Sequence, residues 1–385
     1  MLRCGIMQRN MALPLRGLRN QRQILMMKNK KTVVVGMSGG VDSSVAAYLL
    51  KERGYDVIGV TMQIWQDADI NTVDEGGGCC GISAVEDARR VAARIGIPYY
   101  VMNFRRQFQE FVIDYFVREY REGRTPNPCI ACNRYVKWES LLQKSLAIGA
   151  DYIATGHYAK VWQLANGRYT LLSSDAKGKD QTYALYNLTQ DQLAHTLFPL
   201  GEYEKKDIRQ LAEDVGLPVA HKPDSQEICF VPDNDYAGFL ERETGQKEQA
   251  GNFVNYRGEV LGRHKGIGHY TIGQRKGLGI AFGEPMFVVE IRPDTNEVVL
   301  GRGEDVFTDH LTAHKVNYMA VDHFEEGQKV MARIRYNHEG AAAVIAELKE
   351  DSFSLRFMEP VRAVTPGQAV VLYDQDQVLG GGTIC

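Results

Sequence analysis

The first residues that could do chemistry form a glycine-rich stretch near the start of the chain, Ser38-Gly39-Gly40-Val41-Asp42-Ser43-Ser44. Glycines allow a tight turn and a close approach of the backbone to a ligand. If a helix begins here, its first N–H groups and the serine hydroxyls can hold an anion at the positive end of the helix dipole. The stretch lacks the lysine of a Walker A loop, so it does not predict hydrolysis of a γ-phosphate. A plain helix cap with Asp42 in the first turn is the alternative interpretation.

Two cysteine-bearing segments are the next candidates. The first, Thr125-Pro-Asn-Pro-Cys129-Ile-Ala-Cys132-Asn133, has two prolines and an asparagine, which favour a rigid turn before a helix. Arg134 and Lys137 follow Cys132 closely, and such a setting favours the reactive thiolate. The second segment, Asp224-Ser-Gln-Glu-Ile-Cys229-Phe230, lies about a hundred residues further on. A buried and unreactive thiol is the alternative interpretation for each cysteine.

The elements that must position these residues alternate between short β-branched runs and amphipathic stretches from residue 31 to about residue 217. This β-α-β-α order predicts a doubly wound parallel sheet with helices on both faces. The glycine-rich stretch lies between the first strand and the first helix, and ligands of such sheets bind beyond the carboxyl ends of the strands. The expected strands span residues 32–37, 56–62, 98–104 and 152–155, and the expected helices span 41–53, 83–95, 107–120 and 135–148.

The pattern changes after about Thr244. Residues 251–310 are rich in glycine with two short strands, at 287–291 and 297–300. Residues 311–385 are short alternating segments separated by turn signals, which predicts a small antiparallel barrel or sandwich. We therefore divide the chain into a disordered basic leader (1–30), a doubly wound α/β domain (31–244), a small central domain (245–310) and a C-terminal β domain (311–385).

Composition limits the class of protein. The 385 residues are 44% hydrophobic and 24% charged, as in globular proteins of several domains, and no apolar run is long enough to span a membrane. Seven cysteines argue for a reducing compartment, so we expect a cytoplasmic protein. The leader holds seven basic residues and no acidic one. It could be an organellar transit peptide, or the translation start could be assigned too far upstream. The near absence of serine favours the second interpretation. The remainder holds 38 basic and 48 acidic residues, so any nucleic-acid binding must use local basic patches.

The glycine-rich stretch resembles the pyrophosphate loop (PP-loop) of the ATP-pyrophosphatase superfamily, whose members split ATP between the α and β phosphates. Together with the cysteine segments, further stretches closely resemble the bacterial tRNA-specific 2-thiouridylases from about Thr32 to Gly382. The resemblance implies an adenine nucleotide α-hydrolase-like PP-loop domain, a small central domain and a C-terminal antiparallel β-barrel that contacts tRNA. The further stretches are Thr155-Gly-His-Tyr158, Lys179-Asp-Gln-Thr-Tyr183, Gly273-Gln-Arg-Lys-Gly-Leu-Gly279 and Thr365-Pro-Gly-Gln368.

This resemblance implies ATP-dependent replacement of the C2 oxygen of the wobble uridine, in the tRNA anticodon stem-loop, by sulfur. ATP with Mg²⁺ would adenylate that oxygen and release pyrophosphate. A persulfide on Cys229, received from a sulfur relay protein or a cysteine desulfurase, would supply the sulfur. Cys132 would be the nucleophile, and a transient Cys132–Cys229 disulfide would end the cycle.

The resemblance also assigns binding residues. Arg275 and Lys276, a basic pair among glycines, suit contact with RNA phosphates, although their loop could be a plain connector. His157 could instead be a strand-end histidine, and Lys179 and Asp180 a solvated turn. The residues implied for ATP are Gly36, Met37, Ser38, Gly39, Gly40, Val41, Asp42, Ser43, Met62 and Gly156. Those implied for tRNA are Asn127, Pro128, Cys129, His157, Lys179, Asp180, Gln181, Arg335, Tyr336 and Gln368.

The chain departs from the family pattern at Cys129, where aspartate is common. This departure puts carboxylate-mediated proton transfer near the target base in doubt, and it creates a CxxC pair with Cys132. A [4Fe–4S] cluster on Cys129, Cys132, Cys229 or Cys79 therefore competes with a metal-free persulfide cycle. We favour the metal-free cycle, because the adjacent Cys79 and Cys80 have poor spacing for a chelate.

Two functions of other classes stay open. An amidotransferase or ligase of the PP-loop superfamily that acts on a small metabolite would need no cysteine pair. A non-catalytic RNA-binding module would release no pyrophosphate from ATP in the presence of tRNA.

Overall fold

The computed structural model describes residues 30–64, 82–176, 178–224, 228–281 and 283–385. The expected leader and the Cys79-Cys80 pair lie outside these residues, so the expectations placed on them have no structural counterpart here.

The first part of the chain forms a parallel sheet, and the doubly wound prediction is confirmed. Five described strands run in the order β3-β2-β1-β4-β7. The central strand is a buried valine run, Val33–Val35, with parallel partners on both sides. The chain builds outward from β1 to β3 and then returns to the other side of β1, so a ligand crevice is expected between the carboxyl ends of β1 and β4. The strands are β1 (Thr32–Gly36), β2 (Asp56–Gln63), β3 (Tyr99–Asn103), β4 (Tyr152–Ala154) and β7 (Thr196–Leu197).

Helices cover both faces of this sheet. Val33 and Val35 belong to one core cluster with α2 (Val41–Glu52), α4 (Ile82–Ile95) and α10 (Lys205–Asp214). Val34 points to the opposite face and belongs to a second cluster. That second cluster takes in α5 (Arg105–Phe108), η1 (Gln109–Ile113), α6 (Asp114–Arg121), α7 (Pro128–Ala131), η2 (Cys132–Leu141) and α8 (Leu142–Ala147).

The helix expected over residues 135–148 begins earlier, so its predicted start was wrong. It starts at Pro128, because Asn127 caps it by accepting a hydrogen bond from the Ile130 N–H at 3.2 Å and Pro128 occupies the first turn. From Cys132 the helix is π-helical over ten residues. Wide π turns in helices are rare and are frequent at functional sites. Cys132 thus opens an unusual helical turn.

Two further sheets make up the rest of the chain. A small sheet has the order β10-β11-β8-β9, and six antiparallel strands close a barrel, because β12 pairs with both β15 and β17. The barrel, not the sandwich, is therefore the correct alternative. A hairpin of β5 (Lys160–Gln163) and β6 (Tyr169–Leu172), which the sequence did not predict, joins the barrel sheet beside β17. The remaining strands are β8 (Gly251–Val254), β9 (Val260–His264), β10 (Phe287–Arg292), β11 (Glu297–Gly301), β12 (Phe307–Tyr318), β13 (Lys329–Arg333), β14 (Ala341–Lys349), β15 (Ser352–Arg362), β16 (Ala369–Asp374) and β17 (Gln377–Ile384).

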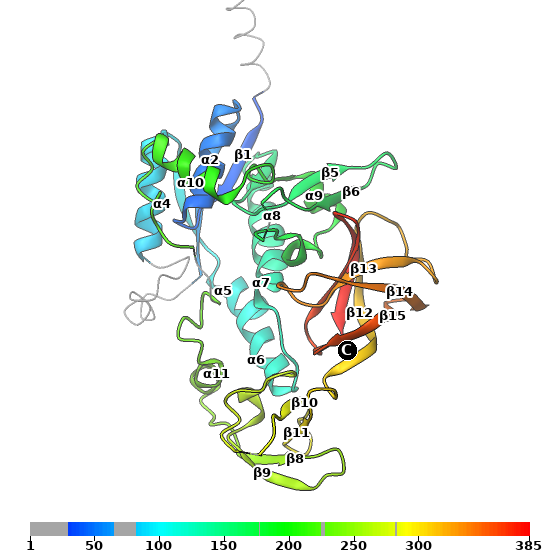
Figure 1. The fold of residues 1–385 in the computed structure, drawn as a ribbon. Helices are drawn as coiled ribbons and strands as arrows, with labels where there is room; N and C mark the ends of the chain where they lie inside the picture. Colours follow the sequence, from blue (N-terminus) through cyan, green and yellow to red (C-terminus); the bar gives the residue numbers. More distant parts are fainter. Residues whose placement is uncertain (1–29, 65–81, 177, 225–227, 282) are drawn as a thin grey trace, which may run out of the picture.

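Figure 1 shows the parallel sheet and its helices at the top, the barrel at the right and the β8–β11 sheet at the bottom. The helices α5, α7 and α6 run down the middle, so the segment that carries Cys129 and Cys132 lies where the parts of the molecule meet. Within the described part of the chain, no helix is long and apolar enough to cross a bilayer.

Candidate active site

The glycine-rich stretch forms the turn from β1 into α2. Gly39 has a φ of 70°, and a Cβ there would lie 2.3 Å from the carbonyl oxygen of Ala84, so only glycine fits. The Ser38 N–H donates to Ser43 Oγ at 3.1 Å, and the two serine hydroxyls are 3.2 Å apart. Gly40 is the N-cap of α2, and no described side chain caps this helix end. The N-terminus of α2 is therefore suited to an anion, as the sequence predicted.

The other residues expected to bind ATP lie at the same edge of the sheet. Gly156 follows β4 and packs against the loop: a Cβ there would lie 2.6 Å from backbone atoms of Asp42 and Ser43. Met62 is half-buried near the end of β2. Gly36 ends β1, and the side chains of Met37 and Val41 are buried in the core below the loop. The fold thus brings the three expected ATP-binding stretches together.

Asp42 is held by two neighbours. The Tyr158 hydroxyl donates to Asp42 Oδ1 at 2.8 Å, and Lys205 Nζ lies 2.7 Å from both carboxylate oxygens. Burial, followed by the negative charge of Asp42, raises the pKa of Tyr158, so this phenol stays a hydrogen-bond donor. The carboxylate is therefore fixed in orientation beside the loop.

The helix that carries Cys129 and Cys132 is anchored on its inner side. Cys129 is exposed and Cys132 is half-buried. The buried Asn133 donates from Nδ2 to the Ala184 carbonyl at 2.9 Å and accepts from Lys137 Nζ at 2.8 Å. These bonds hold the lysine against Asn133, the residue that follows Cys132.

The segment that precedes Cys132 is also clamped by the barrel. Gln368 Nε2 donates to the carbonyls of Thr125 and Pro126 at 3.0 and 3.2 Å, and the Thr125 N–H donates to the Pro366 carbonyl at 2.8 Å. Gly367 has a φ of 88°, and a Cβ there would lie 2.9 Å from the Thr125 oxygen. Gln368 was expected to contact tRNA, and in this structure its amide group holds the backbone of the cysteine segment.

The three residues Lys179, Asp180 and Gln181, also expected at the tRNA, make internal contacts. The Gln181 side chain accepts from the Tyr158 N–H at 2.9 Å. Asp180 Oδ2 accepts from Thr182 at 2.6 Å and from Arg333 of the barrel at 3.2 Å. The segment thus connects the α/β domain to the barrel through side-chain hydrogen bonds, and it is not a solvated turn.

His157 sits among aromatic rings. Its Nδ1 is 2.6 Å from Thr155 Oγ1, and the rings of Trp138 and Phe198 lie 5.6 and 6.0 Å away between centroids. Burial, followed by the charge of Lys137, holds the pKa of His157 well below its usual value. The imidazole is therefore neutral at neutral pH.

The barrel places Tyr336 near the cysteine segment. Its ring meets that of Tyr183 edge-on at 6.4 Å. Burial, with contributions from the charges of Asp180 and Cys129, raises the pKa of the Tyr336 phenol. Arg335 is exposed and donates to the Arg362 carbonyl at 3.1 Å.

Arg275 and Lys276 are exposed in the turn that follows Gly273. Arg362 of the barrel donates to the Gly273 carbonyl at 3.3 Å, and the Gln274 side chain donates to the Lys276 carbonyl at 3.0 Å. The basic pair thus lies on a hydrogen-bonded turn in the connection between β9 and β10 of the central sheet, which Arg362 ties to the barrel.

Cys229 is half-buried and packs against the same core cluster as Cys132. The next residue, Phe230, meets Phe116 and Phe108 edge-on, with centroids 5.1 and 5.8 Å away. The two cysteines, about a hundred residues apart in sequence, thus border one hydrophobic cluster.

Comparison with known proteins covers the whole fold. Residues 31–233 match a model described as a tRNA methyl transferase HUP domain, 237–302 a tRNA methyl transferase PRC-barrel domain, and 308–384 an aminomethyltransferase beta-barrel domain. A protein of Lachnoclostridium phytofermentans named tRNA-specific 2-thiouridylase MnmA is 68% identical over 354 residues, which are 92% of this chain and 99% of that protein. Proteins of Clostridioides difficile and Thermoanaerobacter sp., named in the same way, are 57% and 59% identical over 93% of this chain and 99% of theirs. The chain belongs to the tRNA-specific 2-thiouridylase family.

The domain models mention methyl transfer, whereas these relatives are named thiouridylases. The relatives' name is the more specific guide, because each match runs through all three sheets at more than half identity. The family resemblance predicted from the motifs is therefore confirmed.

A metal centre was one hypothesis for this thiouridylase. Among the described residues, no three or more His, Cys, Asp or Glu side chains are grouped so that they could hold a metal ion. Cys79 lies outside the described residues. The described cysteines form no such group, and we derive no step through a cluster.

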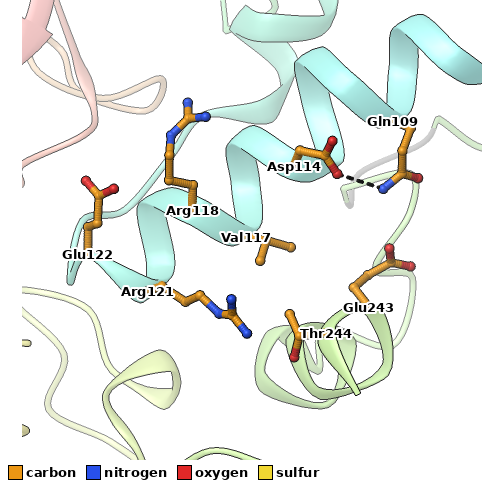
Figure 2. Close-up of a pocket in the computed structure, with 8 residues that line it drawn as sticks. All are labelled: Gln109, Asp114, Val117, Arg118, Arg121, Glu122, Glu243 and Thr244. Atoms are coloured by element: carbon orange, nitrogen blue, oxygen red, sulfur yellow. Dashed lines mark hydrogen bonds between the residues drawn. The ribbon is translucent and has the colours of Figure 1, made fainter. Parts of the chain in front are cut away.

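A cavity of about 360 Å³ lies apart from this site, between α6 and α11 (Tyr236–Thr244). Figure 2 shows that arginines and carboxylates both line it, with Gln109 donating to Asp114 at 2.9 Å. In Figure 1 these helices lie well below β1 and α2. The cavity lining carries both positive and negative side chains, which suits neither a polyphosphate nor an RNA backbone. We therefore do not assign the cavity to the thiouridylase reaction.

Three charged residues of the site were missed in the sequence. Lys205, Asp224 and Arg333 form ion pairs with Asp42, Lys179 and Asp180. Each belongs to a different element, and no local motif marks Lys205 or Arg333. Asp224 stands in the Cys229 segment, and that position was the one signal that could have drawn attention to it.

Proposed function

We propose that this protein catalyses the ATP-dependent 2-thiolation of the wobble uridine of tRNA, converting ATP to AMP and pyrophosphate. The observation that carries this proposal is the match over nearly the whole chain, at 68% identity, to a named tRNA-specific 2-thiouridylase. Two contacts support it: Lys205 links Asp42 of the PP-loop to Asp224 of the Cys229 segment, and Gln368 of the barrel holds the backbone of the Cys132 segment.

The PP-loop and the N-terminus of α2 would hold the phosphates of ATP, with Met62 and Gly156 flanking the nucleoside. Mg²⁺ bound with ATP would neutralise phosphate charge, and Asp42 is the carboxylate that the loop itself offers. Backbone N–H groups and the hydroxyls of Ser38 and Ser43 would orient the α-phosphate for attack.

Chemistry begins at the C2 oxygen of the uridine. This oxygen forms a bond to the α-phosphorus, and the bond from that phosphorus to the bridging oxygen of pyrophosphate breaks. Adenylation turns a poor leaving oxygen into AMP. The base must be extruded from the anticodon stack for this step.

Sulfur then arrives as a persulfide on Cys229. Its terminal sulfur attacks C2 and AMP leaves; the Cys132 thiolate next attacks Cys229 Sγ, so that the C2–S bond is kept, the S–S bond breaks and a Cys132–Cys229 disulfide forms. In the alternative order, Cys132 first releases hydrosulfide, which attacks C2. Either order oxidises two thiols, so an external thiol must reduce the disulfide, and the Cα atoms must approach to about 4.4–6.8 Å.

The partners of this reaction follow from its chemistry. The anticodon stem-loop would lie across Arg275, Lys276, Arg335 and Tyr336, and a persulfide-donating relay protein or cysteine desulfurase would load Cys229. We place the enzyme in the cytoplasm, where thiols stay reduced.

The direct test is mass spectrometry of tRNA nucleosides after incubation of the protein with ATP, Mg²⁺ and a persulfide donor, such as a cysteine desulfurase with cysteine. We expect 2-thiouridine together with equimolar AMP. Thiolation without ATP, or AMP without 2-thiouridine under reducing conditions, would contradict the proposal.

Salt dependence tests the RNA surface. The Arg275→Ala and Lys276→Ala variants should each lower the slope of log Kd for tRNA against log salt by about one unit, because each side chain displaces counterions from one phosphate. Filter binding at several salt concentrations measures this. If the variants have the same slope as the wild type, neither side chain contacts an RNA phosphate.

Gln368 should act on turnover more than on tRNA affinity. Gln368→Ala removes two hydrogen bonds to the backbone of the cysteine segment, each worth about 0.5–1.5 kcal/mol, so kcat should fall about tenfold while the Kd for tRNA changes less than about threefold. Gln163→Ala, on the β5–β6 hairpin, is the control. A large loss of tRNA affinity with normal kcat would show that Gln368 contacts RNA instead.

A further inference from the structure

Tyr158, which the reaction described above does not use, reaches from the end of β4 to the PP-loop. Its side chain is buried, and its hydroxyl donates to Asp42 Oδ1 at 2.8 Å. Lys205 Nζ lies 2.7 Å from both oxygens of this carboxylate, so it compensates the charge without distinguishing one oxygen from the other. The bond from Tyr158 is directed at Oδ1, and it therefore sets the rotation of the carboxylate group.

Gln181 holds the backbone of Tyr158 on both sides of one peptide unit. Its own N–H donates to the Tyr158 carbonyl at 2.9 Å, and its side-chain Oε1 accepts from the Tyr158 N–H at 2.9 Å. Buried backbone N–H groups are costly to leave unpaired. Loss of the Gln181 side chain would therefore force the backbone at Tyr158 to shift.

Gln181 also belongs to the segment that contacts the barrel. Its neighbour Asp180 accepts from Thr182 Oγ1 at 2.6 Å and pairs with Arg333 of β13 at 3.2 Å. An unbroken set of contacts between described residues therefore leads from strand β13 of the barrel to the PP-loop.

The backbone beside Tyr158 packs directly on the loop. A Cβ at Gly156 would lie 2.6 Å from backbone atoms of Asp42 and Ser43, so no free space separates this stretch from the first turn of α2. Closely packed groups transmit small displacements to one another. A shift of the backbone at Tyr158 is therefore felt at Asp42 through packing as well as through the hydroxyl.

We propose that Tyr158 is a positioning residue that acts through Asp42, and that Gln181 fixes Tyr158 for this task; the inference rests on the proposed function, in which the PP-loop holds ATP. The Asp42 carboxylate then has one orientation beside the phosphates before ATP arrives. Such preorganisation matters for the rate, because a misplacement of about 1 Å can cost about a hundredfold. Gln181 thus serves the nucleotide site from a segment that the family resemblance places at the tRNA.

Three measurements on the full-length protein test this role. They are the single-turnover rate of pyrophosphate release from ATP with saturating tRNA, the Kd of α,β-methylene ATP with Mg²⁺ by calorimetry, and the melting temperature. Tyr158→Phe should lower the rate about tenfold or more and change the Kd by less than about threefold, because Asp42 loses its orienting bond but keeps its charge and its contact with Lys205.

Tyr183→Phe is the matched control. Tyr183 is also buried, and its hydroxyl donates to the Ala369 carbonyl of the barrel at 2.9 Å. Its loss removes a phenol hydrogen bond of similar length that does not involve Asp42, so the melting temperature should fall about as much as in Tyr158→Phe while the rate stays near that of the wild type.

Combined variants test whether the residues act through one another. Gln181→Ala should slow the reaction about as much as Tyr158→Phe, and the double variant should be less than about twofold slower than either, because both changes disturb the same bond to Asp42. Gln181→Glu keeps the acceptor oxygen and should retain most of the rate. In an Asp42→Glu background, where the carboxylate is displaced by one methylene group, Tyr158→Phe should slow the reaction by less than about twofold.

The outcomes are distinct. A wild-type rate in Tyr158→Phe, effects that multiply in the double variants, or a loss of analogue affinity as large as the loss of rate would overturn the positioning role and leave the proposed function standing. If Tyr158→Phe does not fold, the contrast between Gln181→Ala and Gln181→Glu decides the question. A wild type that neither binds the analogue nor releases pyrophosphate would overturn the proposed function, and this inference with it.

Discussion

Replacing Cys229 or Cys132 with serine is expected to reduce formation of 2-thiouridine about a thousandfold or more, because a hydroxyl can neither carry a persulfide nor close a disulfide. Adenylation precedes sulfur transfer, so both variants should still release pyrophosphate in a single turnover with tRNA. Nucleoside mass spectrometry and a pyrophosphate assay on the same samples measure the two half-reactions. Normal thiolation by either variant would contradict the persulfide cycle through this cysteine pair.

The other described cysteines provide the controls. Cys129→Ser and Cys385→Ser should keep most of the activity. Burial raises the pKa of the Cys385 thiol, which lies 3.2 Å from His314 at the end of the barrel and away from the PP-loop. Cys129 is the critical case, because it forms the CxxC pair with Cys132. Stoichiometric iron and sulfide in anaerobically purified protein, lost together with activity in Cys129→Ser, would overturn the metal-free cycle; a broad absorbance near about 400 nm would accompany such a cluster.

Much of the α/β fold could be predicted from local patterns. The buried valine run of β1 and the glycines that follow it are adjacent in sequence, so one short window predicts a strand, an anion-binding turn and a helix. The start of the helix around Cys132 does not follow from the prolines alone, which indicate a turn, because it depends on Asn127 capping the first helical turn. The π-helical stretch after Cys132 has no sequence signature that we used.

The missed parts of the site depend on contacts between residues distant in sequence. Gln368 and Thr125 are 243 positions apart, and Lys205 and Asp42 are 163 apart. Composition and spacing within a segment carry no information about such pairs. For this reason the sequence placed Gln368, Lys179 and Asp180 at the tRNA, whereas the structure adds that they join the barrel, the sheet and the cysteine segments. The sequence was therefore least informative about the polar contacts that connect one element of the fold to another.

The PP-loop itself should be indispensable for activation of the base. Asp42→Ala and Ser43→Ala are expected to abolish pyrophosphate release, a loss of about a hundredfold or more, because preorganised groups around a reacting phosphate are each worth about 2.7–4 kcal/mol at comparable sites. Binding of tRNA should change little, since the loop and the exposed Arg275-Lys276 pair belong to different parts of the fold. A pyrophosphate assay and filter binding of tRNA check the two halves of this prediction.

Ser44→Ala is the matched control for Ser43→Ala. Both serines are buried, and both hydroxyls donate to the Gly40 carbonyl, Ser43 at 3.3 Å and Ser44 at 2.8 Å, but only the Ser43 hydroxyl also contacts Ser38 at the turn. Loss of the Ser44 hydroxyl should therefore cost about 1 kcal/mol of folding stability and leave pyrophosphate release nearly intact. If Ser43→Ala and Asp42→Ala both thiolate tRNA normally, the loop does not hold ATP. If Ser44→Ala is as inactive as Ser43→Ala while remaining folded, the loop matters for its shape, and phosphate binding must depend on other residues at the same edge of the sheet.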